Sequence, residues 1–205
     1  MSQWIAGIAR GHNAGVCLLK DGEIVFIVEE ERLTRRKYDG GPYASMVKIL
    51  DYTDKLDYLV IAHTQPDVSR VDFSGENVYP SLARKLRLID KPEQVLDMHK
   101  WHHKMHASCS FYRSGFETAV AVIVDGAGTF INMNIDGEDC MTWELESIFD
   151  CSYPDNLKIL YKHQGGNGSW RASKYMMSSH REGEEGEHEL IIDDSGGIVK
   201  AYEAV

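Results

Sequence analysis

The chain has 205 residues, 43% of them hydrophobic, and a formal net charge of −10, a composition typical of an ordinary globular protein. Its basic residues are scattered apart from one run at 32–37, which argues against a nucleic-acid-binding surface. No apolar run reaches the ~18 residues of a membrane helix, and no apolar leader opens the chain. The four cysteines are widely spaced and form no Cys-x-x-Cys pair, so we expect a soluble, cytoplasmic protein without membrane or nucleic-acid partners.

The N-terminal segment predicts three strands, over residues 4–9, 16–20 and 23–29. Residues 11–15 form a close turn between the first two strands. Asp21-Gly22 is a two-residue loop that favours a primed turn, so the second and third strands should form an antiparallel hairpin. A strand, a small-residue turn and a hairpin are how the actin-like, ribonuclease-H-like nucleotide-binding fold begins.

Helices and strands alternate after this hairpin, which indicates a layered α/β domain. Apolar spacing predicts helices over 42–52 and 80–88, an interior parallel strand over 56–63 and a polar loop over 64–77. A short strand over 95–98 leads into a histidine-rich helix that begins at Trp101. Strands over 120–124 and 130–135 should pair through a turn at 125–129, and 143–149 is a further strand.

The signal weakens from residue 164 onward. Residues 165–168 indicate a flexible break, 171–177 a short helix, 182–188 a solvated acidic segment, and 189–192 with 198–202 a last hairpin. We therefore expect a single domain over 1–205, with a core over 1–163 and a weakly defined segment over 164–205. The predicted fold class is α/β, an actin-like or ribonuclease-H-like mixed sheet opening with a hairpin, and only the N-terminal half of the usual two lobes.

Three side chains are candidate metal ligands. On a helix, His102 and His106 stand at i and i+4 and project from one face, and Asp125 follows a buried strand. Two neutral nitrogens and one carboxylate suit a divalent transition metal with open coordination positions. His103 lies at i+3 from His106 and is an alternative to His102. Polar surface histidines and a turn-forming aspartate remain the other interpretation, and these residues alone support no function.

Three blocks of sequence, in order, resemble the O-carbamoyltransferases, the nodulation and antibiotic-tailoring enzymes. The first comprises residues 7–8, 11–14, 21–25 and 29–37; the second comprises 102–107, 111–112 and 124–128; the third, looser block comprises Tyr153-Pro154, Leu157, Leu160 and Tyr161. The resemblance covers residues 4–130 well and 150–200 faintly.

The resemblance implies that the complete enzyme makes carbamoyl-adenylate from carbamoyl phosphate and ATP, with Mg²⁺, in a C-terminal domain. It then implies transfer of the carbamoyl group to a hydroxyl acceptor in an N-terminal actin-like domain. That second site holds a divalent metal, with Fe²⁺ favoured and Zn²⁺ or Mn²⁺ as alternatives, and His102, His106 and Asp125 match three of its ligands. A fourth ligand, an aspartate from the later half of the fold, has no counterpart here.

Other site residues follow from the same resemblance. His12 matches a histidine near the reacting carbamoyl group, where an imidazole could deprotonate the hydroxyl or donate to an oxyanion. The expected substrate or nucleotide contacts are Asn13, Glu31, Arg32, Arg35, Lys37, Gly126 and Gly128. Guanidinium groups suit phosphate or carboxylate oxygens. A turn-forming Asn13 and a solvated charged loop are the alternatives.

Members of this family are more than twice as long as the chain, so it should not make carbamoyl-adenylate alone. We expect a fragment, a truncated product or one part of a split carbamoyltransferase, completed by a separate second half or associating as a homodimer. A non-catalytic metal- or nucleotide-binding or regulatory module is the alternative. A tRNA-threonylcarbamoylation-related protein ranks last, because its second block lacks the doubled histidine and the Glu-Glu-Arg run.

Overall fold

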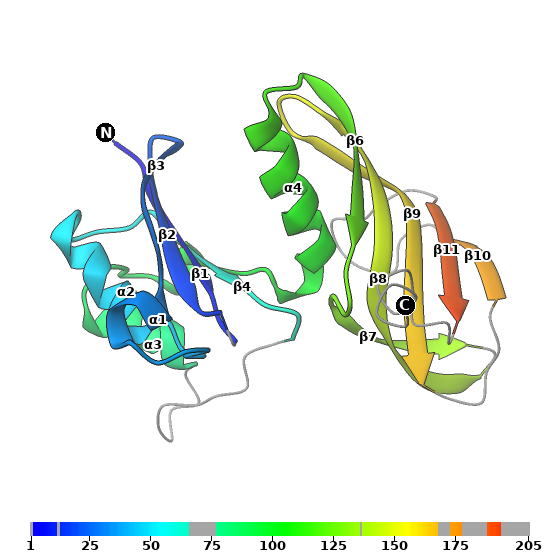
Figure 1. Cartoon of the computed structure of the whole chain (residues 1–205), viewed down its shortest axis with the longest axis horizontal. Helices are drawn as coiled ribbons and strands as arrows, with labels where there is room; N and C mark the ends of the chain where they lie inside the picture. The colour runs from blue at the N-terminus through cyan, green and yellow to red at the C-terminus, as the bar shows by residue number, and fades with distance from the viewer. Residues whose placement is uncertain are drawn as a thin grey trace. The chain divides into compact units, whose positions relative to one another are not determined.

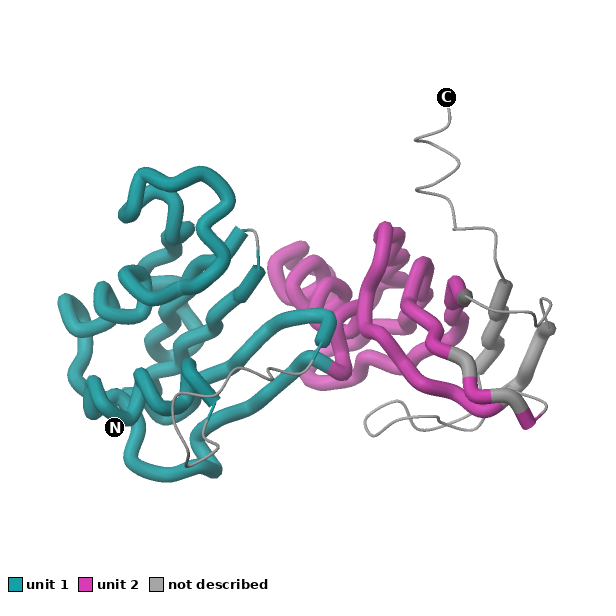
Figure 2. The backbone as a smooth tube through the Cα atoms, turned by 90° about the horizontal axis from the view of Figure 1, so that it is seen from below, with its two compact units in different colours: residues 1–99 teal, residues 100–205 magenta. Residues whose placement is uncertain are grey.

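The computed structural model describes residues 2–11, 13–65, 77–135, 137–167, 173–177 and 188–193. These residues form a mixed α/β protein with two sheets, and the chain divides into two compact units, unit 1 (Met1–His99) and unit 2 (Lys100–Val205) (Figure 2). The single domain predicted over 1–205 stays a prediction. None of the helices in the described part of the chain is long and apolar enough to cross a membrane.

Unit 1 contains a five-stranded mixed sheet with the order β3-β2-β1-β4-β5. Its strands are β1 (Trp4–Ala9), β2 (Gly15–Lys20), β3 (Glu23–Glu29), β4 (Tyr58–Ala62) and β5 (Val95–Asp97). β2 is antiparallel to both β1 and β3, and β4 is parallel to both β1 and β5. Asp21 and Gly22 both have positive φ, 52° and 86°. The predicted hairpin, its primed turn and the interior parallel strand are therefore confirmed.

The helices of unit 1 gather on one face of this sheet (Figure 1). They are α1 (Glu30–Thr34), α2 (Tyr43–Lys48), η1 (Ile49–Asp51), α3 (Val78–Lys85) and η2 (Pro92–Gln94). The buried core packs Ala6, Ile8, Val16, Leu18, Leu59 and Ile61 of the sheet against Met46, Ile49, Tyr79, Ala83 and Leu88. Pro80 stands in the first turn of α3, where its missing N–H leaves no hydrogen bond unmade.

Unit 2 contains a second sheet with the order β10-β11-β9-β8-β6, and β7 pairs with β8 beside this path. The elements are η3 (His99–Trp101), which begins one residue before the unit, α4 (His102–Ser114), β6 (Thr118–Val124), β7 (Phe130–Ile135), β8 (Glu138–Ser152), β9 (Asn156–Asn167), β10 (Ser173–Met177) and β11 (His188–Asp193). Helix α4 lies along the sheet, and its Ala107 and Phe111 pack with Ile123, Phe149 and Ile159 (Figure 1). The predicted histidine helix is thus present.

The predicted pairing of 120–124 with 130–135 is wrong. Strand β8 is 15 residues long, and β6 pairs with its C-terminal part while β7 pairs with its N-terminal part. Both strands therefore lie along one edge of β8, and residues 125–129 connect them without forming a hairpin. A local turn signal cannot reveal that a third, longer strand supplies the hydrogen bonds.

The predictions for the C-terminal part also need correction. Gly165 and Gly166, expected in a flexible break, lie within β9, and a Cβ on Gly165 would stand 2.9 Å from Nε1 of Trp143. That glycine accommodates an aromatic side chain on the adjacent strand. Residues 173–177 of the predicted helix form β10, because β11 pairs with them. Residues 189–192 lie in β11, which is parallel to β9, while 182–187 and 198–202 lie outside the described residues.

Candidate metal centre

Helix α4 and the turn after β6 place the candidate ligands. The backbone N–H of His102, the first helical residue, donates to Oγ1 of Thr129 at 3.3 Å. The helix ends at Ser114, and the following Gly115 has a φ of 78°, the left-handed conformation that glycine adopts readily. Because Ala107 and Phe111 are buried against the sheet, the adjacent face with His102 and His106 lies over the end of β6.

The turn at 125–129 is held to β8 by backbone hydrogen bonds. Asp125 N–H donates to the carbonyl of Leu145 and Gly128 N–H to that of Glu144, both at 2.8 Å. Thr129 N–H donates to Oε2 of Glu144 at 2.9 Å. The backbone of Asp125 is therefore fixed before its side chain makes any contact.

The structure brings His102, His106 and Asp125 together. Nε2 of His102 lies 2.8 Å from Oδ2 of Asp125, and Nε2 of His106 lies 3.0 Å from Nε2 of His102. One donor atom from each residue lies within 4.8 Å of the other two. Gly126 N–H donates to Oδ1 of Asp125 at 2.7 Å, which leaves Oδ2 on the histidine side. Two imidazoles and one carboxylate at this spacing could hold a divalent metal ion.

The charges of the cluster favour the protonation states that metal ligands need. The hydrogen bond from His102 is the main cause that lowers the pKa of Asp125, to about 2. Partial burial, and then the neighbouring His102, lower the pKa of His106 below its ordinary value. At neutral pH the cluster therefore contains a carboxylate and an imidazole with a lone pair available.

His103 lies beneath this cluster and is fully buried. Its Nδ1 is 2.8 Å from Oγ of Ser147, its Nε2 is 3.9 Å from Oδ2 of Asp125, and burial lowers its pKa to about 4. A Cβ on Gly128 would stand 2.7 Å from Nε2 of His103, so Gly128 lies directly against the ring. His103 therefore supports the turn from below and Gly128 packs against it, while the nucleotide contacts expected of Gly126 and Gly128 stay predictions.

A buried polar group behind His103 was not foreseen from the sequence. Nζ of Lys162 and Oε1 of Glu144 form an ion pair at 2.9 Å, with both side chains fully buried. Thr142 donates to Oε1 of Gln164 at 3.2 Å beside them. Polar residues that alternate along β8 were the available signal, but their partners lie on β9, which was not predicted. Burying such groups is unfavourable unless each is paired.

The other predicted residues lie in unit 1. His12 lies outside the described residues. Asn13 is exposed in the turn after β1, and this turn lies against the loop after α1, because Gly11 N–H donates to the carbonyl of Gly40 at 3.0 Å. The turn and the charged segment of unit 1 are thus neighbours, as a shared pocket would require.

The charged segment 30–37 is helical in its first part. Glu31 accepts a hydrogen bond from Tyr38 N–H at 3.1 Å, and Arg32 pairs with Glu29 at 3.5 Å. Arg35 has a φ of 61° and ends α1. Arg32, Arg35 and Lys37 are exposed, with Nζ of Lys37 4.9 Å from the ring centre of Tyr38. Their charged groups are accessible to an anion.

Glu30, grouped with these charges in the sequence, has a structural role. It is buried, and its carboxylate accepts hydrogen bonds from the N–H groups of Ala44 and Ser45 and from the Ser45 hydroxyl, at 2.6–2.8 Å. These groups belong to the first turn of α2. Glu30 therefore caps that helix from a distant part of the chain.

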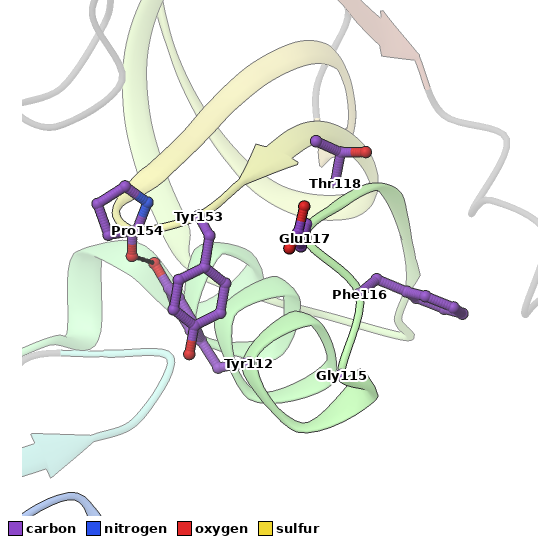
Figure 3. A pocket seen from close by; sticks show the side chains of 7 residues that line it. All are labelled: Tyr112, Gly115, Phe116, Glu117, Thr118, Tyr153 and Pro154. Carbon is purple, nitrogen blue, oxygen red and sulfur yellow. Dashed lines mark hydrogen bonds between the residues drawn. The ribbon is translucent and has the colours of Figure 1, made fainter.

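A surface hollow of about 670 Å³ lies at the opposite end of α4 (Figure 3). Its lining residues are Tyr112, Gly115, Phe116, Glu117, Thr118, Tyr153 and Pro154. Tyr112 donates its hydroxyl hydrogen to the carbonyl of Pro154 at 3.0 Å. The hollow contains none of the candidate ligands, so the loosely matched Tyr153-Pro154 block belongs to a different part of unit 2.

The chain is similar to parts of longer known proteins. No family model matches it. It is 33% identical over 127 residues, 60% of its length, to the Uncharacterized protein MJ1051 of Methanocaldococcus jannaschii. It is 24% identical over 190 residues, 77% of its length, to the Uncharacterized protein sll1178 of Synechocystis, and 29% identical over 139 residues, 58% of its length, to the Nodulation protein NolNO of Sinorhizobium fredii. These alignments span only 22%, 30% and 20% of the respective relatives.

Proposed function

We propose that this chain is the metal-binding N-terminal part of an O-carbamoyltransferase, which transfers a carbamoyl group from carbamoyl-adenylate to a hydroxyl acceptor. The observation that carries the proposal is the convergence of His102, His106 and Asp125, the three residues that match the ligands of that family. The similarity to the Nodulation protein NolNO supports the same family independently of the geometry.

The donor set fits an iron-type ion. Two imidazoles and one carboxylate are a common protein ligand set for Fe²⁺, and Zn²⁺ or Mn²⁺ could use the same atoms. A bound ion would act as a Lewis acid on a carbonyl or phosphoryl oxygen. The chain itself would hold the ion through His102, His106 and Asp125, and would bind anionic oxygens of the donor through Arg32, Arg35 and Lys37.

Unit 1 fits an actin-like fold in its opening. An antiparallel sheet of three strands is followed by parallel strands joined through helices on one face. In that fold the turn after β1 approaches a phosphate, and there His12 would hold or move the proton of the acceptor hydroxyl. Since the chain spans at most 30% of the three relatives named above, the synthesis of carbamoyl-adenylate from ATP with Mg²⁺ and the fourth ligand would come from a second half or a partner copy, whereas this chain would keep a nucleotide-binding turn.

A non-catalytic metal-binding module is the second candidate. All three candidate ligands come from unit 2, so a cation site requires no residue of unit 1. Such a module would bind the metal without binding a nucleotide.

Equilibrium dialysis with Fe²⁺ under anaerobic conditions, with and without ATP, tests the proposal. The wild-type chain should bind one ion and should also retain ATP. The double variant His102→Ala/His106→Ala should lose the ion, whereas His99→Ala, a histidine that contacts Asp97 in unit 1, should keep it. Metal binding without ATP binding would favour the non-catalytic module over the enzyme. A chain that binds no metal would exclude both candidate functions.

A further inference from the structure

The buried imidazole of His103 has one ring nitrogen that no hydrogen bond accounts for. Nδ1 contacts Oγ of Ser147 at 2.8 Å, whereas Nε2 has no hydrogen-bond partner in the part of the chain that the structure describes. Oδ2 of Asp125 lies 3.9 Å from Nε2. A fully buried polar atom without a partner is unfavourable, so its position beside a candidate ligand needs a physical reason.

Electrostatics selects the tautomer of this ring. A neutral imidazole carries its hydrogen on one nitrogen only, and the Ser147 hydroxyl can either donate or accept. If Nδ1 carried the hydrogen, the lone pair of Nε2 would face the Asp125 carboxylate. If Ser147 donates to Nδ1, the Nε2–H group faces that carboxylate instead. The second arrangement places opposite partial charges together and is the favourable one.

The Nε2–H group becomes important when His102 acts as a ligand. In this structure Nε2 of His102 lies 2.8 Å from Oδ2 of Asp125 and supplies its hydrogen bond. A coordinating His102 uses the lone pair of that nitrogen, so it can no longer donate to Asp125. Nε2 of His103 could then donate to Oδ2 of Asp125 instead. A movement of the ring by about 1 Å would shorten the distance between these two atoms from 3.9 Å to hydrogen-bonding range.

The surroundings prevent the ring from turning away. Gly128 packs against Nε2 so closely that a Cβ would stand 2.7 Å from it, and Ser147 holds the opposite nitrogen. Of the buried Glu144 next to the ring, Oε1 accepts from Nζ of Lys162 and Oε2 accepts from Thr129 N–H, both at 2.9 Å, so each carboxylate oxygen already has a donor. The structure therefore leaves Asp125 as the acceptor toward which Nε2–H can move.

We propose that His103 is a positioning residue of the metal centre: oriented by Ser147, it donates from Nε2 to Asp125 and holds this carboxylate in place for the cation. The inference rests on the proposed metal-binding function. It predicts that removing the donor weakens metal binding although His103 is not a ligand.

A Co²⁺ titration, followed by the visible absorption of the bound ion, tests this role with two variants of nearly equal shape. His103→Met lacks a donor and should weaken Co²⁺ binding by about 10- to 100-fold, the usual effect of losing a hydrogen bond to a ligand. His103→Gln keeps an N–H at a similar distance and should remain within about 5-fold of wild type. Circular dichroism checks that both variants fold.

If His103→Met does not fold, the variant Ser147→Ala tests the same role of His103. Loss of the hydroxyl should weaken Co²⁺ binding, and Ser147→Ala combined with His103→Gln should weaken it no further than Ser147→Ala alone, because Ser147 acts through the imidazole. Ser152→Ala, on the same strand, should leave binding unchanged. If the wild-type chain binds no Co²⁺, the metal centre and the proposed function fail. If the wild type binds Co²⁺ and His103→Met binds it equally well, only the role of His103 is wrong. If His103→Met does not fold, equal binding by Ser147→Ala leads to the same conclusion.

Discussion

The two units bury different kinds of side chain beneath their sheets. Unit 1 has a mostly apolar core, and its predicted cationic contacts, Arg32, Arg35 and Lys37, are exposed on α1 and the segment that follows it. Unit 2 buries Glu144, Lys162, Gln164, Ser147 and His103 directly behind the candidate metal centre. Because buried polar groups lower stability unless each is paired, unit 2 accepts an energetic cost beside the candidate metal centre that the interior of unit 1 largely avoids.

Breaking one ion pair in each unit should give the largest difference in stability between the two units. Lys162→Met leaves the buried Glu144 carboxylate without its cation and should lower the free energy of unfolding by about 3–5 kcal/mol. Lys48→Met removes an exposed pair with Asp51 in unit 1 and should leave the urea midpoint almost unchanged, because solvent screens exposed ion pairs. Urea titrations of both variants measure the difference. Equal losses would contradict the contrast between the units.

Acid should destabilise unit 2 through His103. Its pKa is about 4 when folded and 6.5 when unfolded, so below pH 6.5 the unfolded chain binds the extra proton. Stability should therefore fall as the pH drops from 6.5 to 4, by up to about 3 kcal/mol. Metal-free urea titrations in a Trp4→Phe background, where every remaining tryptophan lies in unit 2, measure this loss.

His103→Gln should remove most of that acid sensitivity, although His106 contributes a slope of the same sign because its pKa is also lowered. Asp125 acts in a lower pH range, because its pKa is lowered from 3.8 to about 2 and its contribution to stability is lost only as the pH falls below 3.8. An unchanged pH profile in His103→Gln would show that His103 is accessible to protons in the folded state.

Replacing one glycine by alanine in each unit should give the smallest difference in stability between the two units. Gly128→Ala places Cβ 2.7 Å from Nε2 of His103 and 2.8 Å from Cβ of Glu144, and should cost about 1–3 kcal/mol. Gly7→Ala in β1 meets its nearest atom, the carbonyl oxygen of Cys17, at an ordinary 3.9 Å and should change stability by less than about 1 kcal/mol. Melting temperatures of the two variants measure this difference. A Gly128→Ala variant as stable as wild type would show that His103 can move.

Local signals predicted much of unit 1. Asp21-Gly22 indicates its own turn type, and the apolar run before His63 is a buried strand in any context. In unit 2, the i, i+4 spacing of His102 and His106 placed both on one helix face. These features could be predicted because each depends on residues close together in the sequence.

The remaining features depend on contacts between distant residues. Strand β9 was missed because Gly165 and Gly166 resemble a break, although Trp143 packs over the first of them. Glu30 resembled part of a charged loop because the helix that it caps begins 13 residues later. The pairing of Glu144 with Lys162 required the register of β8 and β9, which no local pattern specifies.

A Zn²⁺ titration of the chain with ¹⁵N-labelled histidines, followed by long-range proton–nitrogen NMR, tests whether His102, His106 and Asp125 share one ion. We expect one ion per chain, shifted Nε2 resonances of His102 and His106, an unligated His103, and loss of these changes in Asp125→Asn. Zinc-dependent shifts confined to other histidines, or full binding by Asp125→Asn, would contradict it.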